Sequence, residues 1–344
     1  MENTTSSDLS GRTSRISSIT KNIWIYGAAF IIVFGTIGNG LSATVMTRKR
    51  LRRHRTSIYL VVLAIVDTAV LYTGLLRHWI REVIDVDVRN ISAPGCKIHI
   101  FLVYFLVHFE AWILVWISAE RLVAVCLPHR AKVIFTVRFV WLQITGTGFV
   151  TFIINLHIFW TVSLKANICV PYNRKYEVFW EEIWSKVDLV ISSFVPFVVM
   201  FLMNLAIVTR LLHLRSTRKR TTSHVTAAPA NAMSTMLITV NFAFLITTSP
   251  VAIYLTNLRA WQHSARTERD RAVLDLVWAC VNMAAYTNNA INFLLYCLSG
   301  PTFKKELVRL VCLGKCAYKV HPQQASFSLT TATVPSNTRD EMNL

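Results

Sequence analysis

The sequence predicts an all-α membrane protein, a seven-transmembrane helix bundle with a short amphipathic eighth helix. Apolar residues make up 53% of the 344 residues and charged residues only 16%, whereas soluble proteins carry about 25% charged residues. The apolar residues gather in seven runs of about twenty residues or more, long enough to cross a bilayer as a helix. No run shows the sustained alternation of a barrel strand. This pattern excludes a soluble globular enzyme.

The seven apolar runs define a bundle over residues 23–298. They fall near residues 23–46, 57–79, 97–121, 139–162, 186–210, 233–257 and 272–298. The preceding residues 1–22 are polar and lack the apolar core of a signal peptide, so the first run must act as the insertion signal. This segment is predicted to be an extracellular tail, and Asn3 begins a glycosylation sequon in it.

The basic residues orient the bundle. The segments 47–56, 129–138, 210–232 and 301–320 carry nineteen basic residues and one acid, whereas 77–97, 165–188 and 259–275 carry twelve basic residues and ten acids. Short loops rich in Lys and Arg stay in the cytoplasm. The N-terminus therefore lies outside the plasma membrane and the C-terminus inside. Because the net charge of +18 follows this alternation, it indicates contact with anionic lipid rather than with nucleic acid.

Residues 299–316 are predicted to form the eighth helix, on the inner membrane surface. Phe303, Leu307 and Leu310 recur at helical spacing in this segment. Cys312 and Cys316 at its end are either palmitoylation sites or unmodified thiols near lipid. The polar, Ser/Thr-rich residues 317–344 are expected to form a disordered cytoplasmic tail.

Two of the seven cysteines are expected to form a disulfide. Only Cys96 and Cys169 fall in outer segments, where the surroundings are oxidising. A Cys96–Cys169 bond would join the start of the third run to the loop between the fourth and fifth runs.

Several short motifs lie one after another along the seven runs. They are Gly38-Asn39-Gly40, Leu63-Ala64-Ile65-Val66-Asp67, Glu120-Arg121-Leu122, Pro196, Pro250 and Asn292-Phe293-Leu294-Leu295-Tyr296. Together with the spacing from Cys96 to Arg121, they resemble those of a rhodopsin-like (class A) G-protein-coupled receptor over residues 23–316. The resemblance implies that an extracellular ligand shifts a conformational equilibrium and thereby activates a heterotrimeric G protein.

Within that family, the runs 244–250 and 292–300 look most like invertebrate neuropeptide receptors of the FMRFamide type. The resemblance implies a short peptide ligand, and an amidated one if the receptor is of the FMRFamide type. Val103 stands where amine receptors have Asp, and Tyr286 where opsins have the retinal-binding Lys. Four positions depart from the family pattern: Gly148, Asn204, Thr248 and Phe293. The departures in the fourth to sixth helices, Gly148, Asn204 and Thr248, keep open a second interpretation, a chemosensory receptor for a small molecule, whereas Phe293 fits the peptide branch.

Two acids, Asp67 and Glu110, lie in the middle of predicted membrane runs, where charge is costly. Glu110 shares a helix face with Arg121, and Asp67 lies in the second run. In the family, the position of Asp67 belongs to a sodium pocket, which Asn39, Asn288 and Asn292 would complete here. We expect Asp67 and Glu110 to hold a sodium ion or to share one proton. In the alternative, Glu110 is neutral and simply hydrogen-bonded. No other cofactor is expected.

At the inner end, the resemblance implies a G-protein switch at Glu120, Arg121 and Tyr296. Arg121 would pair with Glu120 at rest and meet the G protein after opening. A plain salt bridge at the helix end is the alternative.

At the outer end, the resemblance places Asp188 on the face of the fifth helix that family members turn to the ligand, where a carboxylate is suited to a basic ligand group. Arg77 and Trp79 are suited to an anionic or amide terminus and to an aromatic side chain. The predicted ligand-binding set is Arg77, Trp79, Tyr104, Asp188, Tyr254, Trp278, Asn282 and Tyr286. The alternative for its aromatic members is the interfacial belt found in many membrane proteins.

Other functional classes find little support in the sequence. His108 and His157 lack the spacing of a metal site and are expected to be hydrogen-bonded core residues. A transporter would show internal repeats or broken helices, and a membrane enzyme would need a catalytic or metal-ligand set. Neither pattern occurs in the sequence, so no enzymatic activity is predicted.

Overall fold

The computed structural model describes residues 2–220 and 228–311. The elements in chain order are α1 (Glu2–Asn22), η1 (Ile23–Gly27), α2 (Ala28–Met46), α3 (Thr56–Val70), η2 (Leu71–Leu75), α4 (Leu76–Ile84), η3 (Val88–Asn90), α5 (Ala93–Cys126), α6 (Pro128–Ile134), α7 (Val137–Asn155), α8 (Ile158–Thr161), β1 (Val162–Lys165), β2 (Ile168–Pro171), α9 (Arg174–Val178), η4 (Phe179–Trp184), α10 (Ser185–Leu189), η5 (Val190–Phe194), α11 (Val195–Arg220), α12 (Ala228–Ser264), α13 (Glu268–Ser299) and α14 (Pro301–Val311). The η label marks π-helical segments, except that η3 is a 3₁₀ turn.

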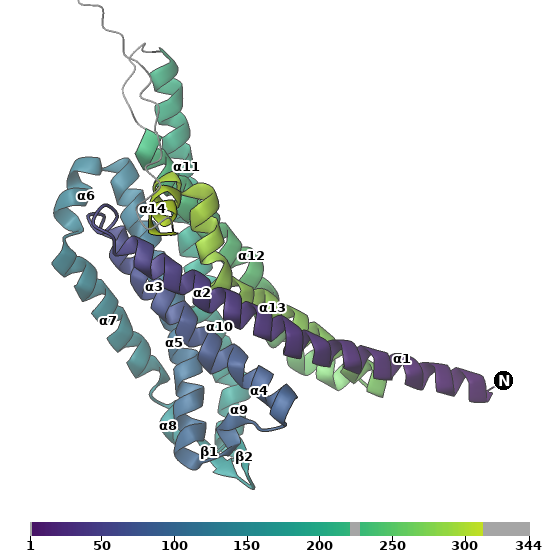
Figure 1. Cartoon of the computed structure of the whole chain (residues 1–344). Helices are drawn as coiled ribbons and strands as arrows, with labels where there is room; N and C mark the ends of the chain where they lie inside the picture. The colour runs from purple at the N-terminus through teal and green to yellow at the C-terminus, as the bar shows by residue number, and fades with distance from the viewer. Residues whose placement is uncertain (1, 221–227, 312–344) are drawn as a thin grey trace, which may run out of the picture.

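The helices lie side by side in an elongated all-α bundle (Figure 1). Among the described residues, five helical stretches are long and apolar enough to cross a membrane: Gly11–Met46, Thr56–Ile84, Ala93–Cys126, Val137–Thr161 and Arg174–Leu214. The helices α12 and α13 follow as the sixth and seventh members of the bundle. The seven-helix fold predicted from the sequence is therefore confirmed.

The two ends of the bundle differ (Figure 1). One end carries the hairpin of β1 and β2, which pair antiparallel from Val162 opposite Pro171 to Lys165 opposite Ile168. Ala166 and Asn167 at its turn have φ of 45° and 60°, the left-handed backbone that a two-residue hairpin turn requires. The opposite end carries α6 and α14. By the loop charges, the hairpin end faces outward and the α14 end faces the cytoplasm.

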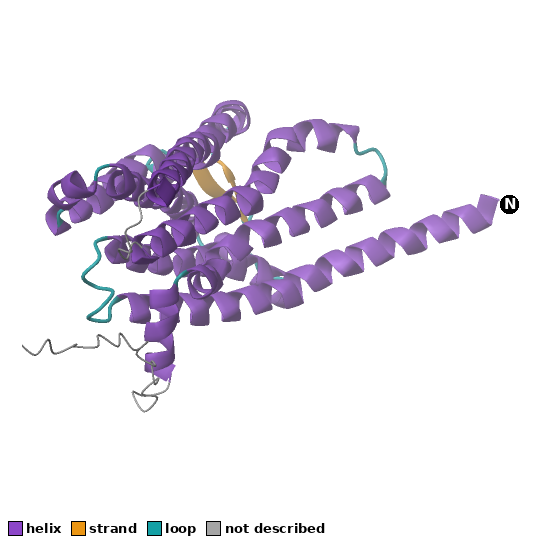
Figure 2. Ribbon diagram, turned by 90° about the horizontal axis from the view of Figure 1, so that it is seen from above, coloured by secondary structure: helices purple, strands orange, loops and turns teal. Residues whose placement is uncertain are grey.

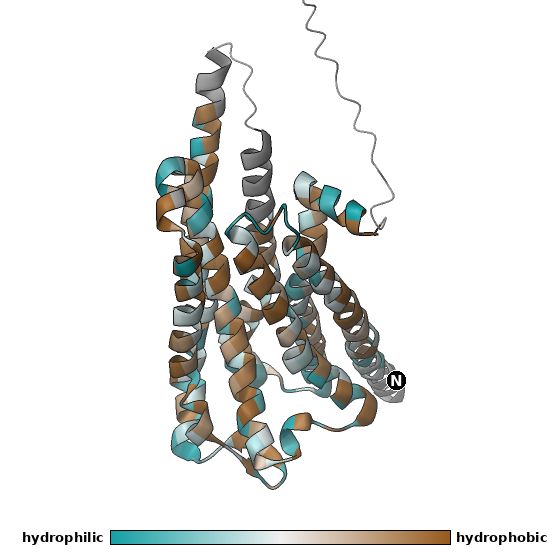
Figure 3. Ribbon diagram, turned by 60° about the vertical axis from the view of Figure 1, so that its left-hand side comes forward, coloured by the Kyte–Doolittle hydropathy of each residue, from teal (hydrophilic) through white to brown (hydrophobic). Residues whose placement is uncertain are grey.

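The bundle buries apolar side chains inside and presents others on its lateral surface. The largest buried cluster joins Tyr59, Leu63, Ile113, Leu114 and Tyr296, among others. Large apolar side chains such as those of Phe149, Ile246 and Leu298 are exposed. Figure 3 shows hydrophobic residues along the bundle and hydrophilic ones gathered toward its ends. Lipid is the solvent that suits such a lateral surface.

Both ends of the described chain are helical. The polar N-terminal residues form α1, which continues through η1 into α2 and extends beyond the bundle (Figure 2). At the other end, α14 packs Phe303 into the core, and this side chain is 2% exposed. Cys312, Cys316 and the predicted tail 317–344 lie outside the described residues.

Candidate functional site: a buried polar core between two charged ends

The first polar cluster lies in the middle of the bundle, where α3, α5 and α13 meet. Asp67 is 0% exposed and Glu110 is 5% exposed. Asn289 Nδ2 donates to Glu110 Oε2 at 2.7 Å and to Asp67 Oδ1 at 3.2 Å, so a single amide joins the two carboxyl groups. Asn288 Nδ2 donates to the other oxygen of Glu110 at 2.8 Å, and Asn292 Nδ2 donates to Asp67 Oδ2 at 2.7 Å.

Asn289 was not predicted from the sequence. The sodium pocket of the family accounts for its neighbour Asn288 only, and adjacent residues of a helix point about 100° apart, so the resemblance gave no role to Asn289. In the structure both side chains reach the acids, because Glu110 presents one oxygen to each. The adjacent pair of amides inside an apolar run was the available signal.

The cluster is rich in oxygen acceptors. Asn39 Nδ2 donates to the backbone oxygen of Asn289 at 2.9 Å, which ties α2 to α13. Asn39 Oδ1, Asn292 Oδ1 and Ser42 Oγ are buried and have no hydrogen-bond partner within the described part of the chain. Carboxylate, amide and hydroxyl oxygens are the ligands of hard cations. These residues therefore fit a small monovalent cation, and they equally fit a proton shared by the acids.

The inner end carries an ion pair between neighbours on α5. Arg121 Nη2 lies 3.1 Å from Glu120 Oε2, and the hydroxyl of Thr56 donates to the same carboxylate. Arg121 Nε is buried and has no hydrogen-bond partner in the ranges that the structure covers. Tyr296 is 1% exposed and packs against Phe303 of α14, with ring centroids 5.6 Å apart.

A second ionic contact at the inner end was not predicted. The Glu306 carboxylate is 5% exposed and lies 2.7 Å from Arg309, 3.5 Å from Arg48 and 3.7 Å from Arg50. It joins α14 to the loop that follows α2. In the sequence, Glu306 is one acid among many basic residues, and this imbalance of charge was the only sign that it makes an ionic contact.

At the outer end, Asp188 is held by two other helices. Asn155 Nδ2 donates to His108 Nδ1 at 2.9 Å, which leaves the ring hydrogen on Nε2. That Nε2 donates to Asp188 Oδ1 at 2.9 Å. His108 is 0% exposed, whereas Asp188 retains 20% exposure. Tyr104 belongs to the same group, since its ring lies 5.8 Å from that of Trp184, which in turn lies 6.1 Å from His108.

The other predicted ligand residues gather on α4, α12 and α13. Trp79, Trp278 and Tyr286 pack against one apolar cluster that includes Leu75 and Ala279. The Tyr254 ring lies 5.2 Å from that of Trp278, and Asn282 donates to the Trp278 backbone oxygen at 2.7 Å. Asp188 and Tyr104 thus form one group, and these five residues form another.

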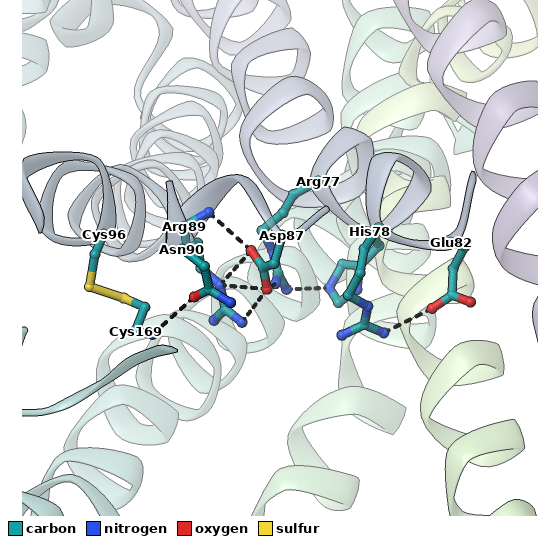
Figure 4. Close-up of polar contacts among 9 residues, drawn as sticks. Arg77, His78, Glu82, Asp87, Arg89, Asn90, Cys96 and Cys169 are labelled. Atoms are coloured by element: carbon teal, nitrogen blue, oxygen red, sulfur yellow. Dashed lines mark hydrogen bonds and ion pairs between the residues drawn. A yellow bond between two sulfur atoms is a disulfide. The ribbon is translucent and has the colours of Figure 1, made fainter. Parts of the chain in front are cut away.

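Arg77, the remaining member of the set, belongs to an ionic cluster in the first outer loop (Figure 4). Arg77 Nη1 lies 3.1 Å from Asp87 Oδ2, and Arg89 Nη2 lies 2.7 Å from the same oxygen. Burial acts to raise the pKa of Asp87, but hydrogen bonds from Arg89 and the charges of Arg77 and Arg89 outweigh it, so the pKa lies well below its ordinary value. Asp87 is therefore a carboxylate at any physiological pH.

The loop cluster connects to a disulfide. Cys96 and Cys169 are bonded, with their Cα atoms 5.6 Å apart, and the bond holds β2 to α5. Asn90 Oδ1 accepts from the backbone N–H of Cys169 at 2.9 Å (Figure 4). This contact attaches η3 to the hairpin through a second link.

The four departures from the family pattern lie in different local surroundings. The Thr248 hydroxyl donates to the backbone oxygen of Phe244 at 2.7 Å, and Asn204 is buried at 3% exposure. Phe293 packs closely on Gly38, because a Cβ added at Gly38 would lie 3.0 Å from the Cβ of Phe293. A Cβ at Gly148 would lie 3.6 Å from the Phe109 ring, an ordinary contact.

The comparison with protein families decides the class. The family described as 7 transmembrane receptor (rhodopsin family) matches residues 38–296, which include all of the polar core. The chain belongs to the rhodopsin family of seven-transmembrane receptors. It is therefore a multi-pass receptor of the plasma membrane that couples to G proteins, and not an enzyme.

Several curated relatives are peptide receptors by name. Neuromedin-U receptor 1 of Mus musculus is 25% identical over 352 residues, covering 90% of this chain and 80% of the relative. Neuromedin U receptor homolog nmur-2 of Caenorhabditis elegans is 26% identical over 171 residues, covering 50% and 42%. CX3C chemokine receptor 1 of Bos taurus is 22% identical over 317 residues, covering 91% and 84%.

Proposed function

We propose that this receptor responds to a short extracellular peptide, in the manner of the neuropeptide receptors. The similarity to neuromedin-U receptors supports a peptide ligand most directly. Val103 opposes a monoamine ligand, because it lacks the carboxylate that would pair with the amine, and Tyr286 opposes retinal, because it lacks the lysine amine to which retinal is bonded. The finer proposal is an amidated peptide of the FMRFamide type, and it rests on the resemblance of runs 244–250 and 292–300.

The ligand-binding residues proposed here are the eight of the predicted set. In this proposal, Asp188 pairs with a basic group of the peptide, since its carboxylate is partly open while His108 holds its other side. The aromatic rings of Tyr104 and Trp184 near this carboxylate suit a guanidinium or ammonium group. Trp79, Tyr254, Trp278, Asn282 and Tyr286 would contact the apolar part of the peptide.

The experiment is a calcium and cyclic-AMP readout in cells that express the full chain. The cells are exposed separately to amidated peptides, their free-acid forms, monoamines and small odorants. A response confined to peptides supports the proposal. A response only to small molecules favours the second candidate, a chemosensory receptor, to which the departures Gly148, Asn204 and Thr248 point.

We further propose that Asp67 and Glu110 bind a sodium ion or share a proton in the resting state. Glu120, Arg121 and Tyr296 would form the switch that the G protein meets after opening. Asn3 is proposed as a glycosylation site and Cys312 and Cys316 as palmitoylation sites. Mass spectrometry of the receptor after glycosidase or hydroxylamine treatment tests these modifications.

A further inference from the structure

The first outer loop holds more positive than negative charge around one carboxylate. Arg77 and Arg89 both engage Asp87, and Arg89 does so with Nε at 3.1 Å as well as with Nη2 at 2.7 Å. The nearby Arg81 is paired with Glu82 at 3.0 Å, so it does not alter the balance. One positive charge in this cluster therefore remains uncompensated (Figure 4).

The arrangement around Asp87 has the geometry of a carboxylate receptor. Arginine recognises carboxylates through two N–H groups in one plane, and here two arginines converge on a single group. Asp87 and Arg77 are 10% and 12% exposed, whereas Arg89 is 30% exposed. A carboxylate of the ligand can therefore approach from the Arg89 side and compete with Asp87 for the two arginines.

The carboxylate that occupies this site comes from a loop connected to the hairpin. Asp87 caps η3 by accepting from the backbone N–H of Arg89 at 3.0 Å. The last residue of η3, Asn90, is bound to the backbone of Cys169 in β2. A group that displaces Asp87 from Arg77 would thus act on η3 and, through Asn90, on the outer hairpin.

We propose that Arg77 and Arg89 bind a carboxylate of the ligand, and that Asp87 closes this site as an internal carboxylate that the ligand displaces. The proposal rests on the peptide-receptor function proposed above and names one chemical group of that peptide. The carboxylate belongs to an acidic side chain, or to a free C-terminus in a ligand that is not amidated, since both present the same group to the arginines.

The test measures the unfolding temperature of the purified full chain with four small probes at constant ionic strength, up to about 50 mM each. N-acetylglutamate amide carries only a side-chain carboxylate, and N-acetylphenylalanine carries only a terminal one. N-acetylglutamine amide and N-acetylphenylalanine amide are their neutral counterparts. Asp87→Asn should bind one or both acidic probes about tenfold or more tighter than the wild type, and neither neutral probe.

Asparagine retains an oxygen that can accept from the Arg89 backbone, so the cap of η3 survives while the charge is lost. Asp87→Ser, whose hydroxyl also caps, repeats the test if the asparagine variant does not fold. The double variant Asp87→Asn/Arg77→Gln should lose the acquired binding. Asp85→Asn is the matched control, because it removes an exposed acid of the same loop that makes no ion pair in the described part of the chain, and it should respond like the wild type.

Equal affinities of wild type and Asp87→Asn for the acidic probes would overturn the proposal, as would binding that survives Arg77→Gln. The probe that binds tells the two carboxylate sources apart. The measurement needs neither a peptide agonist nor a G protein. If the receptor signals in response to peptides yet fails this test, only the carboxylate-site proposal is refuted. If it responds only to odorants, the proposed function is refuted.

Discussion

Replacing Glu110 with glutamine is expected to remove most of the sodium dependence of receptor stability. Asp67 and Glu110 accept from the same nitrogen of Asn289 at 3.2 and 2.7 Å, so the accepting oxygens lie within about 6 Å of each other. Two unit charges at that separation interact by about 3 kcal/mol at an effective dielectric constant of about 20. A cation loses a comparable attraction when one acid is neutralised, which raises its Kd about 100-fold.

The assay is the unfolding temperature of the purified receptor against sodium chloride, with ionic strength held by N-methyl-D-glucamine chloride. Wild type should gain stability with sodium, because an ion that binds only the folded state stabilises it. Glu110→Gln and Asp67→Asn should both lose that gain. Glu82→Gln, at the outer surface, should keep it.

Two results would refute this reasoning or redirect it. A Glu110→Gln variant with the sodium dependence of wild type would show that Glu110 takes no part in cation binding. A wild type whose stability depends on pH but not on sodium would assign a shared proton, and Glu110→Gln should then remove the pH dependence.

Four further predictions concern other parts of the molecule. Asp188→Asn should lower the affinity for a peptide with a basic group by about tenfold or more in competition binding, because that peptide pairs with the carboxylate. The affinity for a peptide without a basic group should stay unchanged. Glu306→Gln should lower the free energy of unfolding by about 1–3 kcal/mol, since three arginines lose their shared carboxylate; an unchanged unfolding temperature would contradict it. Gly74→Ala should destabilise by about 1–3 kcal/mol, because the new Cβ would lie 2.5 Å from Tyr286 Oη, whereas Gly146→Ala, with nothing within 4 Å, should be neutral or stabilising. Because the pKa of Asp87 is lowered, the stabilisation by its carboxylate is fully present above the pKa of an unfolded aspartate, about 3.9, and is lost only as pH falls below that value. The ratio of probe affinities between wild type and Asp87→Asn, measured by thermal shift, should therefore stay constant between about pH 5.5 and pH 7.5.

The helices could be predicted because each leaves a local pattern in the sequence, and the disulfide because only one pair of cysteines was available for it. Apolar runs of membrane length permit only helices or a closed barrel, and the period excluded the barrel. Cys96 and Cys169 were the only cysteines placed on the oxidising side. Asp67 and Asn292 were found because each lies in a motif of the family.

The remaining polar partners were not predictable for a physical reason. His108 joins Asn155 and Asp188, which lie 47 and 80 residues away, and no sequence period connects three helices. Asp87 lies in a short polar loop and Glu306 in an amphipathic helix, and in both segments an acid can equally face water. The π-helical segments η1, η2 and η5 lie within otherwise ordinary apolar runs, and η4 lies just before the fifth run, because packing rather than residue preference sets such insertions.

Phe293 gives the seventh helix an unusual mechanical character. The helix α13 extends from Glu268 to Ser299 without an internal proline or glycine, so the backbone N–H of residue 293 remains available to the helical ladder. A kink has no built-in origin at that point. Movement near Trp278 would then be transmitted to Tyr296 by a tilt of the whole helix, which contacts Gly38 of α2 closely through Phe293.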